Sequence, residues 1–199
     1  AWEVFLWTAR DSSVPLHNYM RALIVTYGDD AMKRFLWPGP CLTCSYGKSM
    51  KFIKPFRGLR PTRELAADIA SHPYDVLNRE EAFALAHGNP LSFLHVNKPE
   101  IDVAPEVSPY DPSVYAKGRE NLDNLVQQGA LVRDNKETLY VYRQIMGEHI
   151  QTGIVAVASV DAYEADLIKK HEFTRPDKED DRVRHMDALG AQVGPVFVT

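Results

Sequence analysis

The sequence is poor in the residues and segments that define secreted and membrane proteins. It has only two cysteines in 199 residues, which excludes a disulfide-rich scaffold. No apolar run approaches the roughly 20 residues that a membrane-spanning helix needs. No basic region precedes an apolar one at the start, as a signal peptide would require. We therefore expect a cytoplasmic protein without a membrane partner.

A strong excess of positive charge is also lacking. Lysine and arginine total 23, aspartate and glutamate total 27, and the formal net charge is −4. This balance argues against a broad nucleic-acid surface, although it is compatible with a local basic patch. No helix-turn-helix pair with a basic second helix is evident. Nucleic acid is therefore not an expected partner.

Motifs of several common enzyme classes are missing. The sequence has no metalloprotease motif, no nucleophile elbow and no Walker-type loop. Cys41 and Cys44 form a C-x-x-C, a spacing used by redox pairs and zinc sites. A second C-x-x-C or a βαβ context would be needed to support either function. We interpret both cysteines as incidental and expect no metal ligands in the protein.

The composition changes at Met50. All three tryptophans and both cysteines precede this residue, and the segment before it has no sustained hydrophobic period. From Met50 onward the sequence resembles a protein start that enters a strand. We therefore expect residues 1–49 to be a non-native or unrelated extension that does not pack into the core, and residues 50–199 to form the domain.

Helical and strand patterns alternate irregularly after Met50, which predicts an α+β fold with a mixed sheet and flanking helices. The capping signals of Thr62, Asn78 and Asp111 each open a predicted helix, and Gly88 and Gly129 end the second and third. The predicted helices cover 62–70, the stretch between Asn78 and Gly88, 112–128 and 176–189. The predicted strands cover 91–96, 139–146, 150–160, 167–170 and 196–198. The two strands 139–146 and 150–160 form a hairpin, and the second is expected to be central because it is almost entirely apolar.

The most informative segment runs from Ile168 to Arg184. Six basic and six acidic side chains lie between Lys169 and Asp187, a pattern typical of a solvated helix. The residues just before the helix differ, because a His171–Glu172 pair stands where an apolar strand leads into a helix start. Such junctions are places where ligands meet backbone donors and the positive end of a helix dipole.

One stripe of the predicted helix 176–189 is basic. At 100° per residue, Lys178, Arg182 and His185 share this stripe, with Val183 and Met186 expected on the buried flank. A basic stripe at the edge of the core is suited to binding an anion. The same charges can instead pair with neighbouring acids such as Asp181 in solvent, and the sequence leaves both interpretations open.

Several motifs after Met50 resemble, in order, the bacterial and archaeal family defined by domain of unknown function 1015. They are the segments 53–61, 73–76, 140–144 and 170–174, together with Lys178, Asp181 and Arg182. Members of this family are roughly twice as long as this chain. The resemblance implies that residues 50–199 are the N-terminal portion of a longer α+β domain, truncated at its C-terminus.

The family also carries a downstream Asp-Gly-His-His-Arg motif that occurs in the ParB/sulfiredoxin-like superfamily, notably in free-serine kinases that use ADP or ATP. These kinases have a His-Glu pair upstream, whose Glu acts as general base. The resemblance implies that Glu172 is the base and that His171 is its neighbour. It implies ADP or ATP with Mg as the cofactor. The residues expected to bind the nucleotide phosphates are Lys170, Thr174, Lys178 and Arg182. This sequence contains no Asp-Gly-His-His-Arg motif.

Two kinds of function remain in competition at this point. The first is a nucleotide-dependent kinase or phosphotransferase that acts on a small hydroxylated, serine-like metabolite. The second is a ParB-like nucleotide-binding regulator or a non-catalytic interaction protein. The expected partners are a nucleotide and a small-molecule substrate, while the sequence leaves the substrate, the nucleotide and the oligomeric state open.

Overall fold

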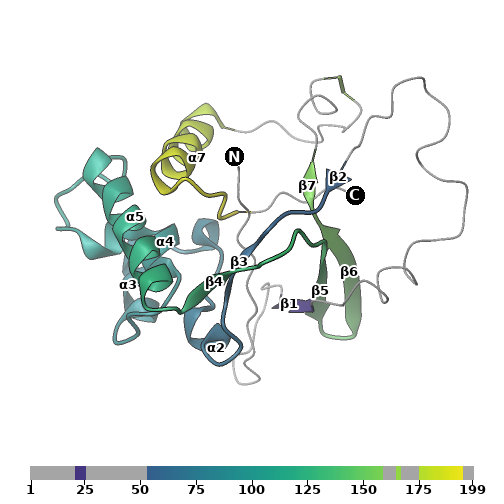
Figure 1. Cartoon of the computed structure of the whole chain (residues 1–199). Coiled ribbons are helices and arrows are strands. Elements are labelled where there is room, and N and C mark those ends of the chain that lie inside the picture. The colour runs from purple at the N-terminus through teal and green to yellow at the C-terminus, as the bar shows by residue number, and fades with distance from the viewer. Residues whose placement is uncertain (1–20, 26–52, 159–164, 167–174, 195–199) are drawn as a thin grey trace, which may run out of the picture.

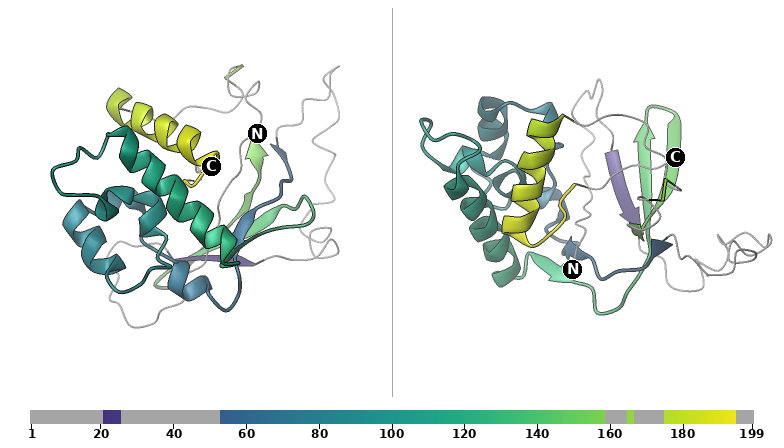
Figure 2. Two further views of the ribbon diagram at one scale, coloured as in Figure 1. Left: turned by 60° about the vertical axis from the view of Figure 1, so that its left-hand side comes forward. Right: turned by 90° about the horizontal axis from the view of Figure 1, so that it is seen from above.

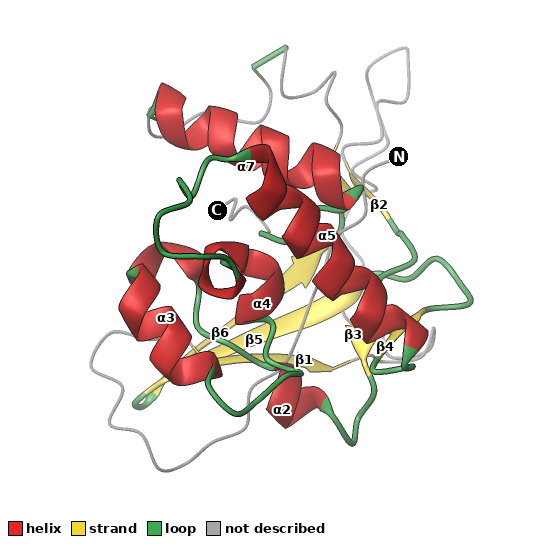
Figure 3. Cartoon of the chain, turned by 90° about the vertical axis from the view of Figure 1, so that its left-hand side faces the viewer, coloured by secondary structure: helices red, strands yellow, loops and turns green. Residues whose placement is uncertain are grey.

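The computed structural model describes residues 21–25, 53–158, 165–166 and 175–194. These residues form an α+β structure, as predicted. Helices gather on one side and short antiparallel sheets on the other (Figure 1), and the view from above shows the same two-sided arrangement (Figure 2). Seen from the helical side, the helices lie in front of the strands (Figure 3).

The elements alternate without a simple repeat. The strands are β1 (Arg21–Val25), β2 (Ile53–Lys54), β3 (Leu59–Pro61), β4 (Leu131–Arg133), β5 (Tyr140–Met146), β6 (His149–Val155) and β7 (Val157–Ala158). The α-helices are α2 (Ala66–Ile69), α3 (Arg79–Ala86), α4 (Leu94–Asn97), α5 (Pro112–Gln127) and α7 (Pro176–Leu189). Two 3-10 helices, η1 (Tyr74–Val76) and η2 (Pro99–Asp102), connect them.

The described strands form three small sheets, with the orders β1-β5-β6, β2-β7 and β3-β4. All of their pairings are antiparallel, so the mixed sheet that we expected is not seen among these strands. The β5–β6 hairpin is confirmed, and Gly147 at its turn has φ 61°. The prediction of a central second arm was wrong, because within the described sheet β5 is central and β6 is at an edge. Apolar content alone does not separate the two arms of a hairpin.

One strand comes from the segment before Met50. β1 pairs with β5 from Arg21 opposite Ile145 to Val25 opposite Val141. The remaining residues before position 53 lie outside the described part of the chain. The assignment of residues 1–49 as a foreign extension therefore stays a prediction.

Three helices begin and end where the sequence predicts. The capping box of α3 is complete, since Asn78 Oδ1 accepts from Glu81 N at 2.8 Å and Glu81 Oε2 accepts from Asn78 N at 2.9 Å. Asp111 caps α5 by accepting from Ser113 N. Gly190 ends α7 in the left-handed conformation, with φ 64°. These signals are local in sequence, which is why the pattern alone finds them.

Two predicted elements differ in the structure. The helix predicted over 62–70 is only α2, because the Thr62 amide donates to Ala130 O and continues the β3–β4 ladder. The strand predicted over 91–96 is wrong, since this stretch turns into α4. Asn89 Oδ1 and Ser92 Oγ accept from the backbone amides of Leu91 and Leu94, which favours a turn over an extended strand.

The main hydrophobic core lies between the helices and β3–β4. It contains Leu59, Ile69, Phe93, Val96, Leu122, Leu125, Ala130, Leu131, Leu189, Ala191 and Val193. Because Leu189 belongs to α7 and Leu122 to α5, the core fixes both helices against each other. The close approach continues at Gly118 of α5, where an added Cβ would lie 3.1 Å from the Pro99 Cγ atom and 3.4 Å from Leu189 Cδ1.

A polar network, here called the Asp134 network, joins β3 to the start of β5 and consists of Gly58, Arg60, Asp134 and Tyr140. Arg60 Nε donates to Asp134 Oδ2 at 2.8 Å, and Arg60 Nη2 donates to Oδ1 at 2.6 Å. The Tyr140 hydroxyl donates to Asp134 Oδ2 and accepts from Gly58 N at 2.7 Å. Two segments of the resemblance, 53–61 and 140–144, therefore meet at this network.

Candidate functional site

The basic stripe of α7 is the part of the predicted site that the structure describes. α7 begins at Pro176 after the N-cap Arg175, which makes no side-chain cap hydrogen bond. Thr174, which was expected to bind phosphate just before this helix, lies outside the described residues. Lys178 and Arg182 stand one turn apart on the helix, as the periodicity predicts.

The C-terminal half of α7 is firmly attached to α5. Arg119 Nη1 donates to the Leu189 carbonyl at 3.0 Å, and Leu189 is buried in the main core. Val183 was expected on the buried flank but is 43% exposed, whereas His185 is only 1% exposed. The buried side of α7 is therefore rotated relative to the prediction, because α5 contacts the face that carries His185.

Arg182 lies on the ring of Tyr74, a residue of η1. Its Cζ atom is 4.1 Å from the ring centroid, a distance typical of a guanidinium stacked on an aromatic face. Arg182 Nη2 and Nε donate to the same oxygen, Oδ2 of Asp181, at 2.7 and 3.1 Å. The remaining nitrogen, Nη1, is buried and has no hydrogen-bond partner among the described residues. An unsatisfied buried donor is costly, so such an atom indicates a missing partner.

Asp181 links Arg182 to α5. Its second oxygen, Oδ1, accepts from the Tyr115 hydroxyl at 2.9 Å. Burial, together with this hydrogen bond to the carboxylate, raises the pKa of Tyr115 to about 12. Tyr115 is therefore a protonated donor at neutral pH, and Asp181 is shared between two partners.

His185 lies under this pair and completes what we call the Arg182 cluster: Tyr74, Tyr115, Asp181, Arg182 and His185. Its Nε2 atom is 2.9 Å from the Val96 carbonyl, a pairing in which Nε2 carries the proton. Its Nδ1 atom is buried without a partner in the described structure. Burial and the nearby positive charge of Arg182 lower the pKa of His185 to about 4, so the ring is neutral at pH 7.

The other cations at the start of α7 are more exposed. Lys178 Nζ donates to the Tyr110 hydroxyl at 3.2 Å and lies 5.8 Å from the centroid of that ring. Arg175 pairs with Asp177 at 2.8 Å. Of the predicted stripe, Arg182 pairs with an acid on the helix, as the second interpretation expects, while Lys178 has an aromatic partner. The interpretation of the stripe as an anion site stays a prediction.

The structure brings together only part of the predicted set. Lys178 and Arg182 lie on α7 as expected, whereas Lys170, His171, Glu172 and Thr174 lie outside the described residues. The sequence analysis did not predict the contact between Tyr74 and Arg182. The available signal was the segment 73–76, which belongs to the resemblance together with Arg182 but could not be placed next to it.

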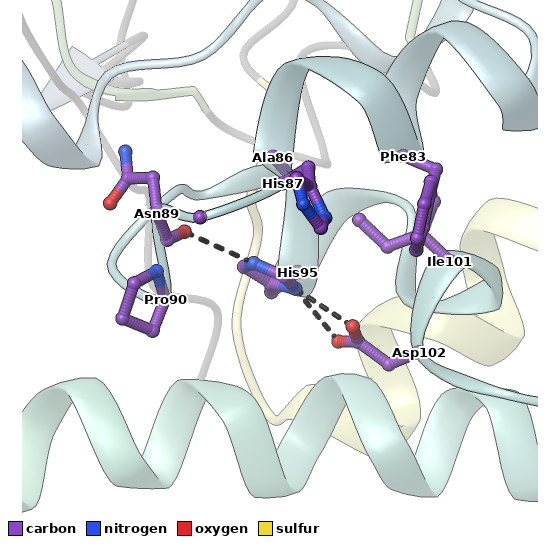
Figure 4. Close-up of a pocket in the computed structure, with 9 residues that line it drawn as sticks. Phe83, Ala86, His87, Asn89, Pro90, His95, Ile101 and Asp102 are labelled. Atoms are coloured by element: carbon purple, nitrogen blue, oxygen red, sulfur yellow. Dashed lines mark hydrogen bonds and ion pairs between the residues drawn. The ribbon is translucent and has the colours of Figure 1, made fainter.

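A second feature is a hollow of about 300 Å³ beside His95 of α4 and Asp102 of η2 (Figure 4). It is lined by Phe83, Ala86, His87, Gly88, Asn89, Pro90, His95, Ile101 and Asp102. Its volume is at the lower end of small-molecule pockets. Its polar groups therefore decide whether it is a candidate site.

Those polar groups already satisfy one another. His95 Nδ1 lies 2.9 Å from both Asp102 oxygens, and His95 Nε2 lies 3.2 Å from the Asn89 carbonyl. The hydrogen bond to Asp102 raises the pKa of His95, against the opposing effect of burial. Asn121 Nδ2 donates to Asp102 Oδ2 at 2.7 Å. Because both ring nitrogens are engaged, His95 ties α4 to η2.

Neither a metal cluster nor a membrane span is found in the part of the chain that the structure describes. Its histidines, cysteines and acids form no group of three or more that could hold a metal ion. No described helix is both long and apolar enough to cross a bilayer.

The comparisons with known proteins identify a family. No match was found among curated proteins or among solved structures, so membership of the ParB/sulfiredoxin-like superfamily stays a prediction. The family model described as protein of unknown function (DUF1015) matches residues 53–199. The match begins three residues after Met50 and contains all the segments on which the resemblance was based. The chain belongs to the DUF1015 family of proteins of unknown function.

Proposed function

We propose that this protein is a nucleotide-dependent phosphotransferase that phosphorylates a small hydroxylated, serine-like metabolite in the cytoplasm. The observation that carries the proposal is the buried Nη1 atom of Arg182, which has no acceptor among the described residues. Arginine is suited to phosphate because its planar group donates several hydrogen bonds at once. A phosphate oxygen would supply the acceptor that Nη1 lacks.

The surroundings of Arg182 favour a phosphorylated ligand. Tyr74 holds the guanidinium on one face at 4.1 Å, so that the group is positioned before a ligand arrives. Lys178, one turn earlier on α7, adds a second cation near the start of a 14-residue helix. A helix start of this kind attracts anions through its backbone donors and dipole. Lys170 and Thr174 precede it in the sequence and supply further donors to the phosphates.

Glu172 is the proposed general base. It lies four positions before Pro176, close in sequence to the phosphate-binding cations, and His171 is its neighbour. Glu172 orients the substrate hydroxyl and accepts its proton as the hydroxyl oxygen attacks the terminal phosphorus. A new oxygen–phosphorus bond forms, and the bond from that phosphorus to the bridging oxygen of the nucleotide breaks. Positioning and charge stabilisation supply most of the catalysis in such reactions.

The nucleotide is ADP or ATP with Mg. Arg182 and Lys178 fit the phosphates of either, because both residues donate only and carry full positive charge. The metal would supply further charge neutralisation of the transferred group. The described residues hold no cluster of metal ligands, and the roles given above to Glu172 and Arg182 do not depend on one.

The test compares two substitutions in the full-length protein. Glu172→Gln should lower turnover by roughly 10²–10⁴-fold and change ADP affinity little, since it removes the proton acceptor but keeps the shape. Arg182→Ala should mainly weaken ADP affinity. Turnover is measured as nucleotide consumption against a panel of hydroxylated metabolites that includes free serine, and affinity is measured by calorimetry.

Arg184→Ala is the matched control, because Arg184 is an exposed arginine roughly 200° around α7 from Arg182. It should leave both turnover and affinity unchanged. If Glu172→Gln keeps wild-type turnover, the phosphotransferase mechanism is wrong. Nucleotide binding without turnover in the wild-type protein would favour the ParB-like regulator instead.

A further inference from the structure

We infer that Asp181 is a built-in competitor for the phosphate-binding group of Arg182, and that the ligand binds by exchanging partners with it. The inference rests on the proposed function, because it assumes that a phosphorylated ligand reaches Arg182. Beyond the proposed function, it states that the Asp181 carboxylate makes the protein bind the nucleotide more weakly than it would without that carboxylate.

The pairing of Arg182 with Asp181 is incomplete. Both Nε and Nη2 point to one oxygen, Oδ2, at 3.1 and 2.7 Å. Arg60 shows the complete form in the same molecule, with Nε and Nη2 bound to separate oxygens of Asp134 at 2.8 and 2.6 Å. Two parallel hydrogen bonds are the stronger geometry for a guanidinium and an oxyanion. The Nε–Nη2 edge of Arg182 is therefore occupied by a weaker acceptor than a phosphate could offer.

The positions of the two residues explain the weaker geometry. Asp181 and Arg182 are consecutive on α7, and consecutive helical residues do not face each other. Asp181 also has its Oδ1 atom on Tyr115 at 2.9 Å, whereas only Oδ2 accepts from Arg182. Each constraint makes the pair easier to separate than the pair in the Asp134 network.

Both side chains have a second partner that holds them after separation. Asp181 retains the Tyr115 hydroxyl, which burial and the carboxylate keep protonated, and Arg182 retains the ring of Tyr74. A phosphate can therefore replace Asp181 on the Nε–Nη2 edge and also supply an acceptor to Nη1. The exchange replaces one singly charged carboxylate with a ligand of higher negative charge.

The decisive experiment is calorimetric titration of ADP, pyrophosphate and adenosine into the wild-type protein and Asp181→Asn. Removing the competing charge should tighten ADP and pyrophosphate binding by about tenfold, within the usual range of coupling between sites. Adenosine, which has no phosphate, should show no change between the two proteins.

Asp177→Asn is the control for a general charge effect. It removes a carboxylate one turn earlier on α7 that pairs with Arg175, and ADP affinity should change by less than about threefold, as expected for an exposed charge screened by solvent.

Tyr115→Phe is a second test, in which the expected change in ADP affinity has the opposite sign. It removes the partner that holds Asp181 away from Arg182, so ADP binding should weaken by about threefold, a small coupling effect. This variant keeps the test valid if Asp181→Asn does not fold.

The outcomes separate the inference from the proposed function. If Arg182→Ala weakens ADP binding but Asp181→Asn does not tighten it, the inference is wrong and the phosphate site stands. An equal gain in Asp177→Asn would also overturn the inference, since it would show only a general effect of charge. If neither ADP nor pyrophosphate binds to any variant, both the inference and the proposed phosphate site are wrong.

Discussion

Two clusters in this molecule share an aspartate, a tyrosine and an arginine. They differ in how many of their buried polar atoms have hydrogen-bond partners. The Asp134 network and the Arg182 cluster each contain an aspartate that accepts from a tyrosine hydroxyl and pairs with an arginine. In the Asp134 network, Arg60 donates to both carboxylate oxygens of Asp134, and every buried side-chain nitrogen and oxygen atom has a partner in the described structure. In the second, two buried nitrogens, Arg182 Nη1 and His185 Nδ1, have none.

The difference is what we expect if one cluster has a structural role and the other has the binding role proposed above. A fully satisfied polar network stabilises one arrangement, because any change leaves a buried group without its partner. A network with unpaired buried atoms is not explained by internal pairing alone, and the atoms left over are open to a partner such as water or a ligand. The comparison therefore supports a structural role for the Asp134 network, and it is the basis on which the Arg182 cluster is proposed as a binding site.

The comparison is tested most strongly by removing the central carboxylate from each cluster. Asp134→Ala should lower the free energy of unfolding by about 3 kcal/mol, because it leaves Arg60 without its acceptor and Tyr140 with only the longer bond to the Phe56 carbonyl. Asp181→Ala should cost less, about 2 kcal/mol, because the pair uses only one carboxylate oxygen and Arg182 keeps its contact with Tyr74, although Tyr115 also loses its acceptor. Denaturant unfolding curves give both values. Equal losses at the two positions would remove the distinction between the clusters.

The next largest effect concerns the tight backbone approach in the Asp134 network. An added Cβ at Gly58 would lie 2.8 Å from the Tyr140 hydroxyl oxygen and 3.1 Å from Cζ. Gly58→Ala should therefore cost about 2 kcal/mol. In a Tyr140→Phe background the nearest clashing atom is gone, and the same change should cost clearly less.

Gly153→Ala is the matched control for Gly58, because an added Cβ at Gly153 of β6 would meet no atom within 4 Å. It should change stability very little, as measured by the same unfolding curves. If Gly58→Ala costs the same with and without the Tyr140 hydroxyl, the contact between these two residues is not the cause of the loss.

The extent to which the sequence predicts these features depends on how local they are. The caps of α3 and α5 depend on residues within one turn, and they were predicted correctly. The contact between Tyr74 and Arg182 joins segments far apart in the sequence, and its two halves were seen only as separate motifs. The Asp134 network has the same character, because Gly58, Arg60 and Tyr140 meet only through the packing of β3 and β5.

The short elements between helices were the least predictable. The apolar run 91–96 fits a strand and a buried helix equally well by periodicity, and the side chains of Asn89 and Ser92 decide for the helix. On α7, Lys178 and Arg182 lie one turn apart as predicted, but His185 is buried and neutral and Val183 is exposed, because the orientation of α7 is set by α5 and the core around Leu189. Tertiary contacts of this kind leave no periodic signal.

The smallest expected effect is the pH dependence contributed by His185. Burial, with the charge of Arg182, lowers its pKa to about 4 in the folded protein, whereas the unfolded value is about 6.5. Below pH 6.5 the unfolded chain therefore binds a proton that the folded protein does not bind. Stability should fall by about 1.5 kcal/mol between pH 6.5 and pH 5 from this group alone. His185→Gln should have a correspondingly flatter profile over that range.

His95 gives the control, because its shift has the opposite sign. The hydrogen bond to Asp102 raises the pKa of His95, so its contribution is fully present below pH 6.5 and is lost as the pH rises through the folded value. His95→Gln should flatten the stability profile above pH 6.5. The slope between pH 5 and 6.5 should stay unchanged, because it comes from His185. Both profiles come from denaturant midpoints measured at a series of pH values. If His185→Gln keeps the wild-type slope below pH 6.5, the ring is not held neutral under Arg182, and the Arg182 cluster loses one of the two unpaired nitrogens that distinguish it from the Asp134 network.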